Sequence, residues 1–374
     1  MGADKVLEVR MPVQASALPE ERLMGKPSVQ QGFPFPLLIL ALLVALFVSV
    51  TLAITIGPVD IPFFTVWKIA LDKVLHITLG EWTKPQEQIV WLVRFPRVLL
   101  AIFVGGGLAI VGATMQAVVR NNMAGPYVLG ISSGASAGAA IAILSGSLLP
   151  FSLYTIPIAA FLGSLCAFAL VFVLARSGGR LSSRRLVLSG IAISYLFSAV
   201  TSLLTYLAPD EGLRRVTFWM MGSLSGAHWA DLTLPAIALL VGMLYLLLQA
   251  RDLNSLVMGE ETAMTLGVDT NGLRKRLFVV TSFLTAMVVV VSGSIGFVGL
   301  MMPHIVRLLV GPDHRRLLPV CMLTGSIFLI WMDVAARMVL APQEVPIGVL
   351  TSIVGSPFFI WLMNRKKGRD IVLG

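Results

Sequence analysis

Long stretches without charged residues are the feature that most constrains this chain. The first runs from Phe33 to Ile56, 24 residues without Lys, Arg, Asp or Glu, whereas about 20 apolar residues suffice for a helix to cross a bilayer. Of the 374 residues, 57% are hydrophobic and only 13% are charged, against about 25% charged in a soluble domain. The sequence therefore predicts an all-α, polytopic membrane protein. It excludes a soluble enzyme, a nucleic-acid binder and a barrel of alternating strands.

Ten apolar segments follow one another along the chain, and we expect each to be a membrane-spanning helix. They are 34–56, 96–119, 127–148, 152–175, 186–207, 231–250, 275–294, 296–311, 317–340 and 346–363. The third and the eighth are short and rich in Gly, so their bounds are the least defined. The two cysteines lie in apolar segments, where small buried hydrophobic residues are expected rather than a disulfide.

The distribution of basic residues predicts the orientation of these spans. With a cytoplasmic N-terminus, the inner segments hold 20 of the 28 Lys and Arg residues. We therefore expect both termini in the cytoplasm of a bacterial inner membrane protein. Residues 1–32 carry four basic and four acidic residues and no signal-peptide pattern, which indicates a flexible cytoplasmic arm. The transmembrane domain is expected over 33–368, followed by a tail at 369–374.

Two outer connections are longer than a turn. Residues 57–93 and 208–230 each contain an amphipathic pattern that favours a short helix on the membrane surface, although a plain connecting loop is the alternative. Rows of small residues mark the second and third spans, with Gly105, Gly106 and Gly107 in one and a four-residue Gly spacing from Gly130 in the other. Such rows allow close helix packing, and they would equally suit the wall of a wide pathway.

Two Gly- and Pro-interrupted polar breaks, at 120–126 and 303–319, stand in corresponding halves of the chain. Such a pair is typical of transporters with an inverted repeat, but two ordinary turns would look the same. His304 and His314 fall in the second break, and neither has a further ligand at metal-binding spacing. We therefore predict no metal site and no cofactor bound by this chain.

The longest inner connection, 251–276, contains a short helix-like segment with acidic residues at its start and Gly at both ends. Gly259, Glu260 and Glu261 begin it, and Gly267 ends it, as helix-dipole and helix-stop chemistry would favour. Gly267-x4-Gly272 resembles the start of a phosphate loop, but Leu273-Arg274 stands where Lys-Ser/Thr is required. If ATP drives this protein, the ATP and Mg²⁺ are bound by another chain.

Several motifs occur in a distinctive order. They are Arg94-Phe95-Pro96-Arg97, the 121–126 break followed by Leu129-Gly130, Gly293-Ser294-Ile295-Gly296-Phe297-Val298-Gly299-Leu300, Pro303-His304, Asp313-His314-Arg315 and Pro346-Ile347-Gly348. From about residue 35 to 368 the chain resembles the FecCD/BtuC-type permeases of ABC importers, which take up vitamin B12, iron–siderophores and haem. Asn121-Asn122-Met123-Ala124 departs from the Asn-Pro-Leu-Ala that is usual in that family.

The resemblance implies a homodimer in membrane lipid with its pathway on the two-fold axis, two ATPase subunits on the inner side and a periplasmic binding protein on the outer side. It implies that Arg94, Arg97 and Arg337 dock the binding protein and that Asn121 and Met123 form a cytoplasmic gate. It further implies an ATPase-coupling helix, whose residues would be Gly259, Glu260, Glu261, Ala263, Leu266 and Gly267. From the residues alone, an ion pair of Arg337 with Asp333 one helical turn away and interfacial positions for Arg94 and Arg97 are the alternatives to docking.

These features predict a permease for an iron chelate, and an overall likeness to haem permeases favours haem. An iron–siderophore or cobalamin cargo within the same family is the first alternative. An ion-gradient transporter is more remote, because it would place ionisable groups at mid-membrane and only Asp333 lies within a span. An intramembrane enzyme would need a paired nucleophile and base or metal ligands inside the spans.

Overall fold

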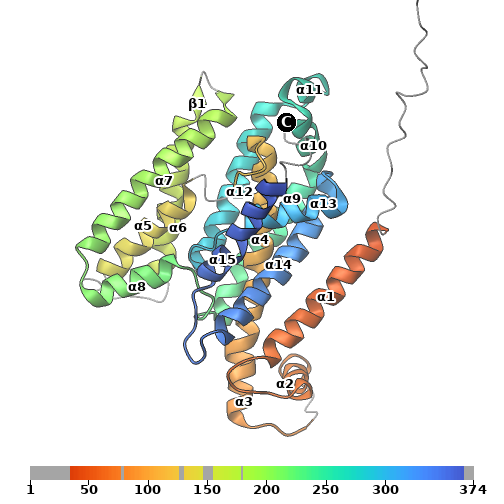
Figure 1. Cartoon of the computed structure of the whole chain (residues 1–374), viewed down its shortest axis with the longest axis vertical. Coiled ribbons are helices and arrows are strands. Elements are labelled where there is room, and N and C mark those ends of the chain that lie inside the picture. Colours follow the sequence, from red (N-terminus) through yellow and green to blue (C-terminus); the bar gives the residue numbers. More distant parts are fainter. Residues whose placement is uncertain (1–33, 77–79, 126–129, 146–154, 178–179, 366–374) are drawn as a thin grey trace, which may run out of the picture. The chain divides into compact units, whose positions relative to one another are not determined.

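The computed structural model describes residues 34–76, 80–125, 130–145, 155–177 and 180–365. The predicted cytoplasmic arm at 1–32 and the tail at 369–374 lie outside the described residues. The described part contains helices, named here as in Figure 1, and one very short pair of strands. Two ends of this helical unit are distinguished below: the α11 end, at the top of Figure 1, and the α3 end, at the bottom.

Seven segments of the described residues are helical, long and apolar enough to cross a membrane. They are α1 (Phe35–Thr55), η2 with α4 (within Lys84–Val119), α6 (Thr155–Leu174), α7 (Ser183–Tyr206), η5 with α9 (Trp229–Leu248), α12 (Thr270–Ser292) and α14 (His314–Met338). Three more apolar helices are shorter: α5 (Ile131–Leu144), α13 (Val298–Val310) and α15 (Ile347–Arg365). Each predicted span thus corresponds to one helix, which confirms the all-α, multi-span prediction.

Helix α4 (Phe95–Val119) is the centre of the unit, and nearly all of its side chains are buried. It packs against α12, α13 and α14. A Cβ atom on Gly105 would lie 2.3 Å from the carbonyl oxygen of Gly325, and one on Gly112 would lie 1.8 Å from that of Gly299. These glycines therefore let the backbones of neighbouring helices touch, which is how small residues promote helix association in lipid.

Helices α5, α6 and α7 form a second packed group. Cβ atoms on Gly134 and Gly138 would lie 2.4 Å and 2.1 Å from the backbone oxygens of Gly163 and Ala159 in α6. The four-residue Gly spacing is thus explained by close packing of α5 against α6 within the chain. The alternative that these rows line a wide pathway is corrected by the structure, because neighbouring helices cover the small residues.

Short helices form in both of the long connections predicted to be outer ones, so the plain-loop alternative is wrong. The first connection contains α2 (Phe63–Leu75) and α3 (Lys84–Gln88), and the second contains α8 (Asp210–Met220). Helix α2 buries Val66, Ile69 and Ala70, while its Lys73 forms an ion pair with Glu87. Helix α8 buries Val216 and exposes most of its other side chains.

The fold departs from a purely helical one at a single small hairpin in the described residues. Strands β1 (Arg176–Ser177) and β2 (Arg180–Leu181) pair antiparallel between α6 and α7. The hairpin is attached to α12, because Arg274 donates to the carbonyl oxygen of Leu181 at 2.8 Å and the amide oxygen of Asn271 accepts the Leu181 N–H at 3.1 Å.

Backbone breaks precede two of the three short apolar helices. Gly130 (φ +74°) stands before α5 and Phe297 (φ +65°) before α13. A left-handed residue is costly for Phe, which lacks the freedom of Gly, so the surrounding packing holds this turn. The second predicted break, 303–319, is wrong in its bounds, because Pro303 lies inside α13 and only 311–313 separate α13 from α14. The inverted repeat stays a prediction.

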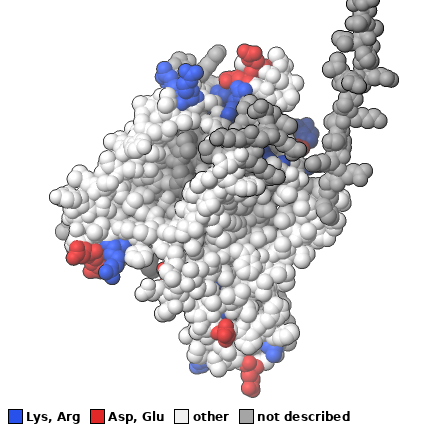
Figure 2. All heavy atoms as spheres, viewed as in Figure 1, with Lys and Arg blue, Asp and Glu red and all other residues white. Residues whose placement is uncertain are grey.

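Charged side chains are concentrated at the ends and at one lateral site of the unit (Figure 2). The broad face between them is white in Figure 2, meaning that it carries neither acidic nor basic side chains. Elsewhere on the unit many apolar residues are exposed as well, such as Leu240, Leu244 and Leu248 on α9 at 62–72%. A surface of this kind suits lipid as its solvent.

Candidate functional sites in the helical unit

The predicted coupling segment, 251–276, forms two short helices before α12. Helix α10 (Ala250–Met258) is joined to α11 (Glu260–Thr265) by Gly259, which has φ +133°. Gly267, also at positive φ (+83°), follows α11. The structure thus agrees with the predicted Gly-bounded helix with acidic residues in its first turn.

Helix α11 is anchored on one side and open on the other. Ala263 is fully buried, and the carboxylate of Glu260 accepts from the Arg274 guanidinium of α12 at 3.3 Å. Glu261 is exposed, and so is Leu266 at 62%. Of the two acidic residues predicted to meet an ATPase, one is therefore engaged within the chain and the other is free to face a partner.

The predicted gate residues lie in an irregular turn that ends α4. Arg120 has φ +56°, and the N–H of Asn121 donates to the carbonyl oxygen of Gln116 at 3.1 Å. The side-chain oxygen of Asn121 accepts the N–H of Met123 at 2.8 Å, and Met123 is 54% exposed. Both residues lie at the surface of a single chain. Pro126 and Leu129, quoted in the same motif, lie outside the described residues.

A buried polar network links this turn to α13, and sequence reasoning missed it. Arg307 donates to the side-chain oxygen of Gln116 at 2.5 Å. The amide nitrogen of Gln116 lies 3.4 Å from the carbonyl oxygens of Gly299 and Leu300 at the start of α13. A polar Gln inside an otherwise apolar span was the available signal, because such residues seek partners within the protein.

A second group of polar contacts joins the predicted coupling segment to the start of α14. The amide group of Asn254 on α10 donates to Asp313 at 2.7 Å, and its oxygen accepts the backbone N–H of His314 at 2.9 Å. Nδ1 of His314 lies 2.7 Å from the same oxygen. Burial raises the pKa of the Asp313 carboxyl, but the Asn254 and Arg315 N–H donors and the charges of Arg315 and Arg316 outweigh it, so the pKa is lowered.

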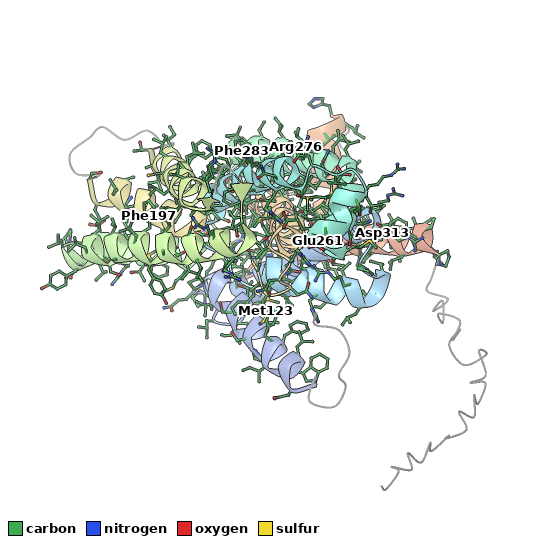
Figure 3. All side chains as sticks on the ribbon, turned by 90° about the horizontal axis from the view of Figure 1, so that it is seen from above. Met123, Phe197, Glu261, Arg276, Phe283 and Asp313 are labelled. Carbon is green, nitrogen blue, oxygen red and sulfur yellow. The ribbon has the colours of Figure 1, made fainter. Side chains whose placement is uncertain are left out.

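Figure 3 views the unit from the α11 end. It shows Met123, Glu261 and Asp313 toward the middle of the projection, whereas Phe197 of α7 lies to the side. Helix α10 of the predicted coupling segment packs against α4 and α14. His304, the other histidine of the second break, lies instead against Phe358, with ring centroids 6.3 Å apart. No group of three potential metal ligands occurs within the described ranges.

The three arginines predicted to dock a binding protein are buried, at 4–5% exposure. Nε of Arg97 donates to Asp333 at 2.8 Å and Nη1 donates to Glu344 at 2.8 Å. Nε of Arg337 lies 3.2 Å from the other oxygen of Asp333, one turn away on α14. The i, i+4 alternative for Arg337 is therefore confirmed.

Arg94 is held by backbone rather than by carboxylates. Its guanidinium donates to the carbonyl oxygens of Ile54, Thr55 and Val59, at 2.6, 2.9 and 2.5 Å. Arg94, Arg97, Asp333, Arg337 and Glu344 together are called the buried arginine cluster below. Its geometry corrects the premise that these arginines present their charge at the surface, because each guanidinium is enclosed and paired within the chain. Docking through them stays a prediction that requires the cluster to open.

Among the hollows in the surface of the described residues, two are larger than a third of about 330 Å³ beside Asn254 and Asp313. The larger, of about 740 Å³, runs along α15 and is lined by Met221, Ser294, Ser352 and Ser356 among others. The second, of about 520 Å³, lies beside α8 and includes Arg214, Arg215 and Trp219. The larger hollow lies between the break before α13, at Ser294 and Gly296, and one side of α15.

Comparison with known proteins places this geometry in a family. Residues 41–365 match the FecCD transport family. The chain is 40% identical over 337 residues to the hemin transport system permease protein HmuU of Yersinia pestis, covering 89% of this chain and 97% of that protein. It is 41% identical over 319 residues to the vitamin B12 import system permease protein BtuC of Klebsiella pneumoniae subsp. pneumoniae, covering 81% and 95%.

Other relatives extend the range. The Fe(3+)-citrate import system permease protein YfmD of Bacillus subtilis is 35% identical over 333 residues, covering 89% of this chain and 95% of that protein. A solved structure described as an inward-facing metal-chelate type ABC transporter superposes with a TM-score of 0.77 at 33% identity, covering 88% of this chain and 99% of that one. The helical order, the matched length and these relatives agree: this chain is a multi-pass membrane permease of the FecCD transport family of ABC importers.

Proposed function

We propose that this permease carries an iron chelate, with haem as the preferred cargo, from the periplasm to the cytoplasm. The hydrolysis of ATP would take place on a separate chain, since this sequence has no phosphate loop. The coupling segment would transmit the conformational change of the ATPase to this chain. The turn at Asn121 and Met123 would then open toward the cytoplasm. Both termini would lie in the cytoplasm.

The observation that carries this proposal is the large hollow along α15. Its volume of about 740 Å³ falls in the range of about 300–1,000 Å³ that small-molecule sites occupy. Its lining combines Met221 with the hydroxyls of Ser352 and Ser356, a mixture that can slide past a large amphipathic cargo without holding it tightly. Fixed charges are missing from its lining residues, which further favours passage over storage.

The assembly follows from the open faces of the chain. A second copy covering α15 would close the hollow into a pathway on a two-fold axis, as closed symmetry favours for homo-oligomers. Two ATPase subunits would contact α11 of each copy through Glu261 and Leu266. A periplasmic binding protein would meet the α3 end, and the buried arginine cluster would have to open for its guanidinium groups to take part.

Uptake measurements test the cargo. The full chain would be expressed with a candidate ATPase and a candidate binding protein, in an iron-limited bacterial strain that makes its own haem but lacks its own importers for haem and iron citrate. We expect growth with haem as the iron source. This growth should be lost when a substitution in the ATPase abolishes the hydrolysis of ATP. Growth on iron citrate but not on haem would overturn the haem assignment while leaving an iron-chelate permease.

Cobalamin is the second candidate cargo. The identity to the vitamin B12 permease BtuC of Klebsiella pneumoniae, 41%, matches the identity to the haem permease HmuU, 40%, so overall similarity favours neither. Ligand titration of the cognate binding protein separates them. Tight binding of cyanocobalamin with no binding of haem would replace haem by cobalamin as the cargo.

A further inference from the structure

The hollow of about 520 Å³ beside α8 combines basic, aromatic and apolar side chains. Arg214, Arg215, Phe218 and Trp219 come from α8, and Glu344 comes from the connection between α14 and α15. Its apolar wall includes Ile143 at the end of α5. We call it the arginine hollow. It is separate from the hollow along α15, from the coupling segment and from the predicted gate.

The charge of the arginine hollow is not balanced. Its one carboxylate, Glu344, already accepts from Arg97 at 2.8 Å. Arg214 and Arg215 are exposed. Asp210 and Glu211 precede them by four residues on α8, yet neither pair comes within the 4 Å of an ion pair in the described part of the chain. Two guanidinium groups, which stay protonated at any physiological pH, therefore line the hollow without an ion pair in the described residues, with Asp210 and Glu211 one helical turn away.

Flat apolar surface lies next to these charges. Phe218 is 55% exposed, and Trp219 lines the same hollow one residue further on. Aromatic side chains offer a large rigid face for a planar ligand. The neighbouring guanidinium groups offer forked donors that suit carboxylates. The combination fits a planar ligand with an apolar face and two carboxylate arms.

We propose that the arginine hollow is a cargo-recognition site that binds the carboxylate arms of a planar iron chelate before it enters the pathway. This inference rests on the proposed function and deepens it. A haem presents two propionates and an aromatic macrocycle, so it satisfies both halves of the hollow. The corrin of cobalamin is edged by neutral amides, so it gains nothing from Arg214 and Arg215. The hollow thus selects for a carboxylate-bearing chelate.

Direct titration of the full chain in lipid nanodiscs tests the site. The probes are haem, its dimethyl ester, which lacks both carboxylates, and cyanocobalamin, with empty nanodiscs as the blank. The test variant is Arg214→Gln combined with Arg215→Gln, and the control is Lys84→Gln, an exposed basic residue outside the hollow. We expect the double variant to bind haem about 100-fold more weakly, about tenfold for each arginine, which corresponds to about 1.4 kcal/mol each.

Binding of the ester is the control for folding. A general loss of structure would weaken the binding of ester and haem alike, whereas loss of the two arginines should weaken only haem. We expect the ester to bind the double variant and the wild type equally, and Lys84→Gln to behave as the wild type with every probe. Equal weakening of haem and ester, unchanged haem binding in the double variant, or no haem binding by the wild type would each overturn the site.

The uptake assay distinguishes failure of the arginine hollow from failure of the proposed transport function. Haem uptake that is insensitive to the double substitution would overturn the arginine hollow and leave haem as the cargo. Arginine-dependent haem binding without ATP-driven haem uptake would support the hollow and overturn the proposed transport function.

Discussion

Charged side chains are used in opposite ways at the two ends of the helical unit. At the α3 end, Arg97, Asp333 and Arg337 are buried and paired with one another. At the α11 end, Glu261 is exposed, and the ion pair of Glu260 with Arg274 leaves the Glu260 side chain 44% exposed. The buried cluster is thus enclosed by its own chain, whereas the first turn of α11 presents a carboxylate to the surroundings.

The difference shows that the position of a charge along a membrane protein does not reveal its task. A buried pair is expensive to break because the remaining partner is left in a poor solvent. An exposed pair contributes about 0–1 kcal/mol and can exchange partners easily. The α3 end is therefore suited to fixing the geometry of α4 and α14, and the α11 end is suited to meeting another chain. Four substitutions test this contrast between the buried cluster and the exposed end.

The largest effect is expected from Asp333→Ala. It removes the carboxylate that Arg97 and Arg337 share, and loss of one partner of a buried ion pair costs about 3–5 kcal/mol. The midpoint of thermal unfolding in detergent, followed by tryptophan fluorescence, should fall clearly. Glu261→Ala is the matched control at the exposed end and should leave it unchanged. An equal midpoint for Asp333→Ala would mean that water enters the cluster.

Gly259→Val should act on coupling more than on folding. Gly259 has φ +133°, a conformation that costs a residue with a side chain about 1–3 kcal/mol, so the join between α10 and α11 should be displaced. We expect ATP-driven transport in proteoliposomes to fall about tenfold, the equivalent of about 1.4 kcal/mol, while the chain stays folded.

Gly226→Ala is the control for this substitution, because a Cβ there would meet nothing within 4 Å. Transport at the wild-type rate by Gly259→Val would show that the shape of the α10–α11 join does not matter for coupling.

Glu260→Gln should have a small effect that depends on salt. The lost pair with Arg274 is partly exposed, so the cost is expected to be about 0–1 kcal/mol and to vanish at high ionic strength. Thermal unfolding of wild type and variant at two salt concentrations measures it. A large cost that persists in concentrated salt would place Glu260 with the buried cluster rather than with the open end.

The smallest effect concerns pH and Asp313, which caps α14. Its pKa is lowered in the folded state, so its contribution to stability is present above the unfolded pKa of about 3.9 and is lost as pH falls through the lower folded value. Asp313→Asn keeps a capping side chain and should flatten the acid limb of the stability curve. Glu261→Gln serves as the exposed control. An unchanged acid limb in Asp313→Asn would contradict the assignment.

The helices were predictable because a bilayer imposes a simple rule on sequence. Every predicted span matches one helix, including the short third and eighth segments, since long charge-free runs have no other stable arrangement in lipid. The Gly-bounded coupling helix was predictable for a local reason, as Gly259 and Gly267 both stand at positive φ.

The partners of the polar side chains were not predictable in the same way. Arg97 and Asp333 are 236 residues apart, and Gln116 and Arg307 are 191 apart, so no local pattern links them. Of the arginine contacts, only the pair of Arg337 with Asp333 could be seen in advance, because helix periodicity brings residues four apart together. The arginine hollow depends likewise on the meeting of α8 with the connection before α15.

The short length of α13 has a consequence for the lipid around the protein. Its 13 residues rise about 20 Å at 1.5 Å per residue, while the hydrocarbon core is about 30 Å thick. The irregular backbone before it must therefore sit at hydrocarbon depth, where exposed amides are intolerable. The carbonyl oxygen of Ser292 accepts the N–H of Ser223 at 2.9 Å, so the loop after α8 shields this backbone. Because of hydrophobic mismatch, the conformation of the backbone between α12 and α13 should depend on bilayer thickness. Lipids with shorter acyl chains should make it easier for α12 and α13 to separate there.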